Sequence, residues 1–186
     1  MARHIPAASK LLICCALLLP LAANAQLLDI LTGKDDAEKK EFTELEIKLP
    51  PMPQPSNLLQ FEPSAASSNR FFIDAASISI NDDGTVRYTL VVRSPSGAEN
   101  ISYEAMRCDT IERKPYAFGR RDGTWSNSRT ATWQRIQYKD VNRQYSVLYA
   151  DYFCPDGSQI ASAKDAIARF KYGVPRDAPP RSGNRH

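Results

Sequence analysis

Alternation of apolar and polar residues is strongest in the middle of the chain, and it predicts β-structure there. Within residues 85–93, TVRYTLVVR, apolar side chains recur at every second position, which is the period of a half-buried strand. The residues expected to face inward are Val86, Tyr88, Leu90 and Val92, and those expected to face outward are Arg87, Thr89 and Arg93. Turn signals bound this strand, NDDG before it and SPSGA after it.

Shorter extended segments on both sides of this strand complete the predicted sheet. We expect them at 58–62, 71–74, 77–80, 101–108 and 114–118, with a further candidate edge strand at 44–49. Pro115 favours an edge position for its strand because proline cannot donate a ladder hydrogen bond. Strand alternation places Tyr116 and Phe118 together on the core face. Consecutive strands joined by short turns indicate an antiparallel meander.

The period changes to that of helices after Trp125. Residues 126–132 are polar and are expected to form a loop. The first helix has Asn142 as its expected N-cap, ends before Pro155, and carries an apolar stripe of Tyr145, Leu148, Tyr149 and Tyr152. The second begins with a capping-box pattern at Ser162, ends at Gly173, and carries a stripe of Ala163, Ala166, Ile167 and Phe170.

Strands followed by helices, without β-α alternation, predict an α+β domain. We therefore expect an antiparallel meander sheet with two C-terminal helices packed on one face. This single domain is placed at residues 58–173, after an N-terminal linker at 26–57. The polar, proline-rich tail at 174–186 is predicted to be disordered.

The first 25 residues have the pattern of a cleaved signal peptide. Arg3 and Lys10 precede the short apolar run LLICCALLLPLA, and the small-residue site ANA lies before Gln26. An N-terminal membrane anchor is the alternative. Export predicts a periplasmic location, with association to the outer membrane as a further option, and no membrane span after cleavage.

Cys108 and Cys154 are the two cysteines that remain after the predicted leader. In an oxidising compartment such a pair predicts one disulfide between the sheet and the first helix. Two free thiols or a metal site are the alternatives. A metal site would need more ligands, and the mature chain has a single histidine, His186, in its tail. We therefore expect no metal and no cofactor.

Charge and composition narrow the function classes. The chain has 24 basic and 21 acidic residues, and removing Arg3 and Lys10 with the leader leaves 22 against 21, a net charge of +1. This charge does not favour nucleic acid as a partner. A scarcity of histidine disfavours Ser-His-Asp and Cys-His catalysis. A carboxylate-dependent hydrolase stays open, and its candidate acids are Glu104, Asp109, Glu112, Asp122, Asp140 and Asp151.

The segment from Ile101 to Trp125 holds the densest mixture of aromatic and basic residues. Arginines beside aromatic rings suit anionic or sugar-containing ligands, through charge, hydrogen bonds and stacking. The alternative is that the rings are core residues and the arginines decorate a turn, as strand alternation predicts. The candidate binding surface is Arg113, Lys114, Tyr116, Arg120, Arg121 and Trp125.

The runs NISYEAMRCDTIERKPYAFGRRDGTW and VLYADYFCPDG resemble the cryptic-neisserial-protein-like family, bacterial envelope proteins of unassigned function. The resemblance covers residues 45–173 and implies that both cysteines are family features, but it implies no catalytic residues. A weaker resemblance, carried by FFIDAASISINDDGTVRYTLVV and the later MRCD, is to surface-adhesin protein E-like domains. That likeness implies an antiparallel sheet, a helical C-terminal part and a Cys–Cys link.

Together these features predict an exported, non-enzymatic binding or structural module of the cell envelope. Its expected partner is an unidentified envelope component, which is a protein, a glycan or a lipid head group. The alternatives from other classes are a hydrolase of cell-wall glycan and a surface adhesin that binds a host protein.

Overall fold

The computed structural model describes residues 41–64, 66–139 and 142–174. The predicted signal peptide, the first part of the predicted linker and nearly all of the predicted tail lie outside these residues. The compact unit that contains the sheet begins at Phe42, 16 residues before the domain start expected from the sequence at residue 58.

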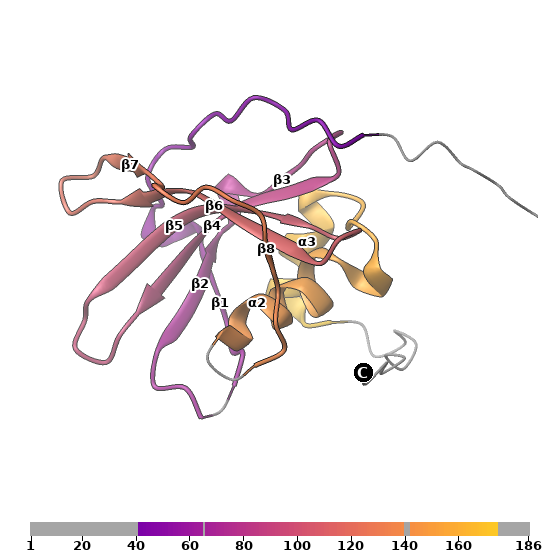
Figure 1. Ribbon diagram of the computed structural model, residues 1–186. Coiled ribbons are helices and arrows are strands. Elements are labelled where there is room, and N and C mark those ends of the chain that lie inside the picture. The colour runs from indigo at the N-terminus through magenta and orange to yellow at the C-terminus, as the bar shows by residue number, and fades with distance from the viewer. Residues whose placement is uncertain (1–40, 65, 140–141, 175–186) are drawn as a thin grey trace, which may run out of the picture. The chain divides into compact units, whose positions relative to one another are not determined.

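An eight-stranded antiparallel sheet forms the centre of this unit, in the order β1-β2-β4-β5-β6-β7 (Figure 1). The short strands β3 and β8 pair with β4 and β6 respectively. This confirms the predicted meander and the α+β class. The strands are β1 Leu58–Phe61, β2 Arg70–Asp74, β3 Ser79–Ile80, β4 Thr85–Arg93, β5 Glu99–Arg107, β6 Glu112–Gly119, β7 Trp125–Asn127 and β8 Gln134–Arg135.

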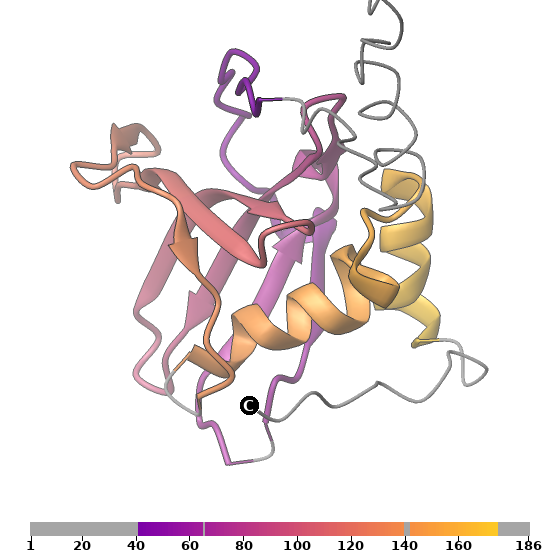
Figure 2. The same ribbon diagram turned by 45° about the vertical axis from the view of Figure 1, so that its right-hand side comes forward.

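The three elements α2, η5 and α3 follow the sheet in the chain and cover one of its faces, which we call the helical face (Figures 1 and 2). The first helix begins as α2 and continues as the π-helical segment η5. Asn142 holds the expected N-cap position, but its side chain makes no capping hydrogen bond. Ser162 caps α3 as predicted, because its hydroxyl accepts from the Asp165 N–H. The helical elements are η2 Pro55–Asn57, η3 Ala75–Ser77, α2 Arg143–Val147, η5 Leu148–Phe153, η6 Pro155–Gly157 and α3 Ala163–Tyr172.

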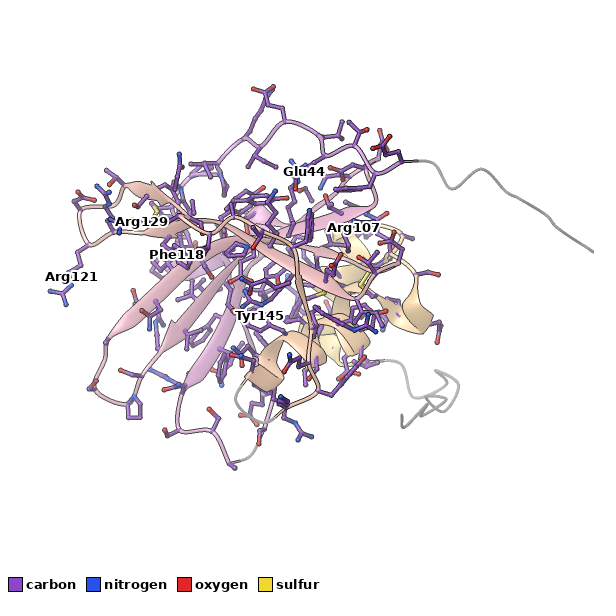
Figure 3. All side chains as sticks on the ribbon, in the orientation of Figure 1. Glu44, Arg107, Phe118, Arg121, Arg129 and Tyr145 are labelled. Atoms are coloured by element: carbon purple, nitrogen blue, oxygen red, sulfur yellow. A yellow bond between two sulfur atoms is a disulfide. The ribbon has the colours of Figure 1, made fainter. Side chains whose placement is uncertain are left out.

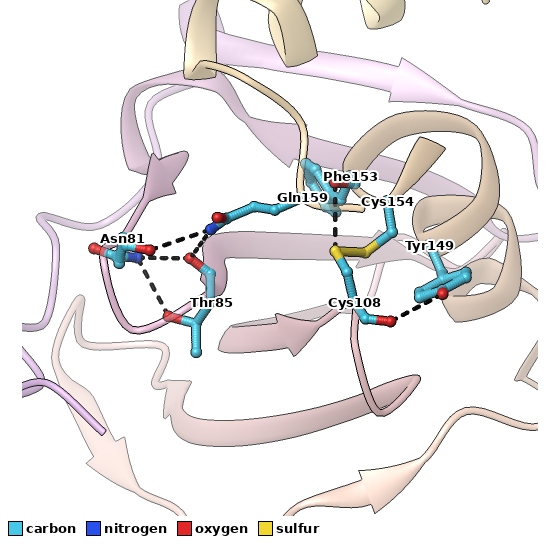
Figure 4. The surroundings of a disulfide bond; sticks show 7 residues. All are labelled: Asn81, Thr85, Cys108, Tyr149, Phe153, Cys154 and Gln159. Atoms are coloured by element: carbon cyan, nitrogen blue, oxygen red, sulfur yellow. Dashed lines mark hydrogen bonds between the residues drawn. A yellow bond between two sulfur atoms is a disulfide. The ribbon is translucent and has the colours of Figure 1, made fainter. Parts of the chain in front are cut away.

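The main core lies between the helical face and the helices. Val86, Tyr88 and Leu90 of β4 all belong to it, as their alternation predicts. The ring of Tyr88 stacks on that of Phe153 at 4.8 Å between centroids. Cys108 and Cys154 form the predicted disulfide between the end of β5 and the end of η5 (Figure 4). Beside it, the Tyr149 hydroxyl donates to the carbonyl of Cys108 at 3.0 Å, so a hydrogen bond supports the covalent link.

The other face of the sheet is covered by residues 42–54, which we call the strap. Residues 44–49 do not form the edge strand expected from their alternation. The strap is held by side chains instead: Arg87 donates to the carbonyls of Leu45 and Glu46 at 2.9 and 3.0 Å. Because both faces of β4 are therefore covered, Arg87 is only 4% exposed and Thr89 is fully buried. Both side chains face away from the main core, as the alternation predicts, but the strap keeps them from solvent, which was not predicted.

Two strands in the segment after residue 124 were not expected from its polar sequence. β7 pairs with residues 117–119 of β6, and β8 pairs with residues 112–113. Strand β6 is consequently not an edge strand, in contrast to the expectation from Pro115. Proline is tolerated because residues 114–116, which include it, lie between the two short partner strands, where no ladder donor is required.

Candidate functional site

A β-bulge in β6 decides which of its side chains meet. Glu104 pairs with Pro115 and Tyr103 pairs with Ala117, so Tyr116 is an extra residue in the ladder. One extra residue reverses the alternation beyond it. Phe118 therefore lies on the helical face, opposite to Tyr116, and is 47% exposed. The prediction that Tyr116 and Phe118 share one core face is wrong, whereas Tyr116 itself is buried as expected.

On the helical face, Glu104 is the centre of a buried polar cluster and is 1% exposed. Its carboxylate accepts hydrogen bonds from Ser102 at 2.6 Å, from Tyr145 at 3.3 Å and from Tyr88 at 3.4 Å. The Arg113 guanidinium lies 3.5 Å from the same carboxylate. Four polar partners satisfy a charge that would otherwise be costly to bury.

Arg113 and Tyr145 form the outer part of this cluster. The guanidinium carbon lies 3.8 Å from the centre of the Tyr145 ring, a close cation-π contact. Burial, and then the neighbouring Glu104 carboxylate, raise the pKa of Tyr145 above its usual range, so its phenol stays protonated and donates. The cluster is thus a neutral ion pair framed by hydroxyl groups.

A pocket of about 370 Å³ opens above the cluster on the helical face. Its floor comes from β4, β5 and β6, and Tyr145 of α2 and the segment between β7 and β8 form its sides. Hydroxyl, amide and guanidinium groups face this space together with the ring of Phe118. The lining residues are Leu90, Val92, Asn100, Ile101, Ser102, Glu104, Arg113, Pro115, Phe118, Thr130, Gln134 and Tyr145.

A second pocket of about 320 Å³ lies beside the first. Arg113, Gln134 and Tyr145 line both pockets and therefore lie at the boundary between them. An Arg113 N–H donates to the Gln134 side-chain oxygen at 3.3 Å and links two of these three residues. The remaining described residues that line the second pocket are Arg135, Ile136, Gln137, Lys139 and Asn142.

Three members of the predicted binding surface hold the strap on the opposite face. Lys114 and Tyr116 both donate to the Glu44 carboxylate, at 2.6 and 2.8 Å. The indole N–H of Trp125 donates to the Pro50 carbonyl at 2.8 Å. Burial, and then the hydrogen bond to Glu44, raise the pKa of Tyr116 well above its usual range, which keeps this donor protonated. These three side chains therefore have a structural role, which is to hold the strap on the sheet.

Arg120 and Arg121 occupy a third place, the turn between β6 and β7. Arg120 donates to the Ser126 hydroxyl at 3.0 Å across the hairpin. Arg121 is exposed and projects from the tip, away from the other labelled side chains (Figure 3). Of the six predicted residues, only Arg113 lines the two pockets. The predicted surface is therefore divided among three sites.

The carboxylates considered from the sequence do not form a pair in the first pocket, where Glu104 is the single acid among the lining residues. Asp109 pairs with Arg107 at 2.8 Å, and the Asp122 carboxylate accepts from Thr124 at the hairpin tip. Glu112 also lies near Arg107, Asp151 is in η5, and Asp140 is outside the described residues. The described part of the chain contains no cluster of three His, Cys, Asp or Glu placed for a metal ion.

The sequence carries a signal for the cluster. The predicted disulfide directs Cys108 toward the first helix, and counting back in steps of two places Met106, Glu104 and Ser102 on the same face as Cys108. A glutamate at an inward strand position requires polar partners. Its partners come from β4, β6 and α2, which only the tertiary structure brings together.

Comparison with known proteins identifies the group to which these features belong. A sequence model of the CNP1-like family matches residues 37–171, which include the strap, the sheet, α2 and all of α3 except its last residue. The chain belongs to the CNP1-like family. A relative in this group is "Cryptic neisserial protein 1" of Neisseria gonorrhoeae (strain ATCC 700825 / FA 1090), 26% identical over 164 residues, which cover 78% of this chain and 79% of the relative.

The comparison with solved structures found no match. The family membership confirms the first of the two resemblances noted in the sequence, and the likeness to surface-adhesin protein E-like domains stays a prediction. Within residues 41–174, so far as they are described, no helix has the length and hydropathy needed to cross a bilayer.

Proposed function

We propose that this protein is an exported, non-catalytic module that binds a component of the cell envelope in the first pocket of the helical face. The observation that carries the proposal is the Glu104–Arg113–Tyr145 cluster at the pocket floor. Burying an ion pair is an inefficient way to stabilise a fold, since an apolar replacement often serves as well. A buried polar cluster beside an open cavity supports ligand recognition instead.

Export is supported by two independent features. The leader pattern in residues 1–25 predicts secretion. The buried Cys108–Cys154 disulfide suits an oxidising compartment, because cytosolic proteins keep such thiols reduced. The expected mature protein begins at Gln26. Osmotic release of periplasmic contents followed by intact-mass measurement tests both location and cleavage, and a full-length mass in the cytosolic fraction would contradict the proposal.

Binding rather than hydrolysis is proposed for the pocket because of how Glu104 is held. A glycosidase with two carboxylates needs an acid and a second acid or nucleophile at a defined separation. Here one carboxylate lines the pocket, and three hydroxyl groups and one guanidinium already surround it. Such a group is suited to fixing the orientation of Arg113 and Tyr145 rather than to exchanging protons with a substrate.

The test compares components retained from envelope extract by immobilised wild-type protein and by a blocked variant. Thr130→Trp places a large ring at the exposed rim of the pocket. The matched control is Arg121→Trp, an equally exposed position at the hairpin tip. We expect a protein, glycan or lipid, identified by mass spectrometry, that wild type and control retain and Thr130→Trp loses. Identical profiles for all three proteins would remove the pocket from the proposal.

A further inference from the structure

The two pockets are adjacent because they share three lining residues. Arg113, Gln134 and Tyr145 border both spaces, and a hydrogen bond joins the side chains of Arg113 and Gln134. Gln134 lies on β8 and Tyr145 on α2 (Figure 1), so residues of separate elements meet at this boundary. Because the two spaces have these lining residues in common, a ligand longer than one ring that passes over them contacts both.

The floor of the first pocket offers side chains and no strand edge long enough to pair with a peptide. Strands β4, β5 and β6 pair with one another below the pocket, apart from the bulge at Tyr116. Residues 114–116 of β6 have no second partner strand, but they contain Pro115, which cannot donate, and the Tyr116 carbonyl accepts from the Ser128 N–H at 2.8 Å. A peptide that adds to a sheet needs a free strand edge. A saccharide needs hydroxyl, amide and guanidinium partners together with an aromatic or apolar surface. Ser102 supplies the hydroxyl, Asn100 the amide and Arg113 the guanidinium. The half-exposed ring of Phe118 supplies the aromatic surface.

The second pocket differs from the first in its charge. Its described lining residues include the three cations Arg113, Arg135 and Lys139 and no carboxylate. Arg113 is compensated by Glu104, whereas Arg135 and Lys139 line the pocket and are exposed to solvent. Guanidinium and ammonium groups in one concave space attract an anion, and a guanidinium favours a carboxylate in bidentate geometry.

We propose that the two pockets form one elongated site for an acidic saccharide. A neutral sugar ring occupies the first pocket beside Phe118 and Ser102, and a carboxylate of the next ring faces Arg135 and Lys139 in the second. This inference rests on the proposed function of the first pocket and adds the chemical class of its ligand. Glu104 orients Arg113, which forms the boundary between the two subsites.

The experiment titrates the purified protein with short oligosaccharides of hexuronic acid and with neutral hexose oligosaccharides of equal length, by calorimetry. We expect the acidic series to bind at least tenfold more tightly, since one charge-assisted contact is worth about that factor. Its affinity should also fall as salt is added. Arg135→Gln/Lys139→Gln should remove the preference for the acidic series and leave the neutral affinity unchanged, and Thr130→Trp should abolish binding of both.

The controls separate this inference from the function on which it rests. Arg121→Gln removes an exposed cation of the hairpin tip and should change neither affinity. Equal binding of both series, or tighter binding of an acidic peptide than of the uronic acid series, would overturn the saccharide assignment. If no saccharide binds while retention of an envelope component still depends on Thr130, the ligand class is wrong and the pocket function stands. If neither saccharide binding nor retention of an envelope component depends on Thr130, both the saccharide assignment and the proposed function of the pocket are wrong.

Discussion

Replacing Arg87 by methionine tests how the strap is held on the sheet. The side chains of Arg87 and Asp83 are 5% and 1% exposed, and their charged atoms lie 2.8 Å apart. Arg87 also supplies the donors for two strap carbonyls. Breaking a buried pair by removing one partner costs about 3–5 kcal/mol because the other charge stays buried.

The expected cost lies near the lower end of this range. After Arg87→Met, the Asp83 carboxylate keeps hydrogen bonds from the Thr85 N–H, the Thr85 hydroxyl and the Leu45 N–H. These partners lower the penalty but do not neutralise the charge. We therefore expect a loss of about 3 kcal/mol in the free energy of unfolding. Adding Asp83→Asn to the same chain should recover part of this loss, because the unpaired charge disappears.

The assay is urea unfolding followed by tryptophan fluorescence. The chain has two tryptophans, and both contact the strap: Trp125 donates to Pro50, and the Trp133 ring lies 5.7 Å from that of Phe42. The matched control is Arg93→Met in the same strand, whose ion pair with Glu99 is much more exposed and should cost less than about 1 kcal/mol. Equal losses for the two variants, or additive losses in the double variant with Asp83→Asn, would refute the reasoning.

Three further predictions concern the disulfide, pH and packing. Cys108→Ser/Cys154→Ser removes the disulfide, whose cysteines are 46 residues apart in the chain, and should lower the free energy of unfolding by about 4 kcal/mol. Wild-type protein with the disulfide reduced should unfold at the same urea concentration as this variant. Burial alone would raise the pKa of Asp83, but hydrogen bonds from Thr85 and Leu45 and the Arg87 charge outweigh it and hold that pKa below its ordinary value. The stability from this group is therefore present above pH of about 4, its unfolded pKa, and is lost as pH falls through the lower folded pKa. The stability difference between wild type and Asp83→Asn should shrink over that acidic range, and a difference that stays constant down to pH of about 2 would contradict this assignment. Gly119→Ala should lower the free energy of unfolding in urea by about 1–3 kcal/mol, because an added Cβ would lie 2.9 Å from Cβ of Ile101 in β5 and 2.9 Å from the end of the Met52 side chain in the strap. An unchanged free energy of unfolding would mean that β5 and the strap move away from the added methyl group without cost.

Strand β6 has a different role on each face of the sheet: its side chains hold the strap on one face and line the first pocket on the other. The extra residue at Tyr116 is what allows this division: alternation directs Lys114 and Tyr116 to the strap, and the bulge turns Phe118 to the pocket on the other face. Without the bulge, Phe118 would lie on the strap face and the pocket would lose its aromatic side. The segment that looked like one binding surface in the sequence therefore contributes separately to architecture, to the pocket and to an exposed turn.

Much of the local structure follows from the sequence. Alternation located β4 at its observed ends, and the serine at 162 located the start of α3, because these signals act between near neighbours in the chain. The disulfide followed from two cysteines in a chain with an export signal. The π-helical continuation of α2 as η5 and the two short strands after residue 124 were not predicted, since their hydrogen bonds depend on packing rather than on periodicity.

The sequence by itself determined the longer strands and the two C-terminal helices, the order in which they follow one another, and that the cysteines pair. Only the tertiary structure decided what covers each face of the sheet. Alternation shows which side chains share a face but not what lies opposite, so Arg87 looked solvent-exposed until the strap was seen to cover it. The polar cluster around Glu104 likewise depends on tertiary structure, because its partners Tyr88, Arg113 and Tyr145 come from three other elements, up to 41 residues away in the chain.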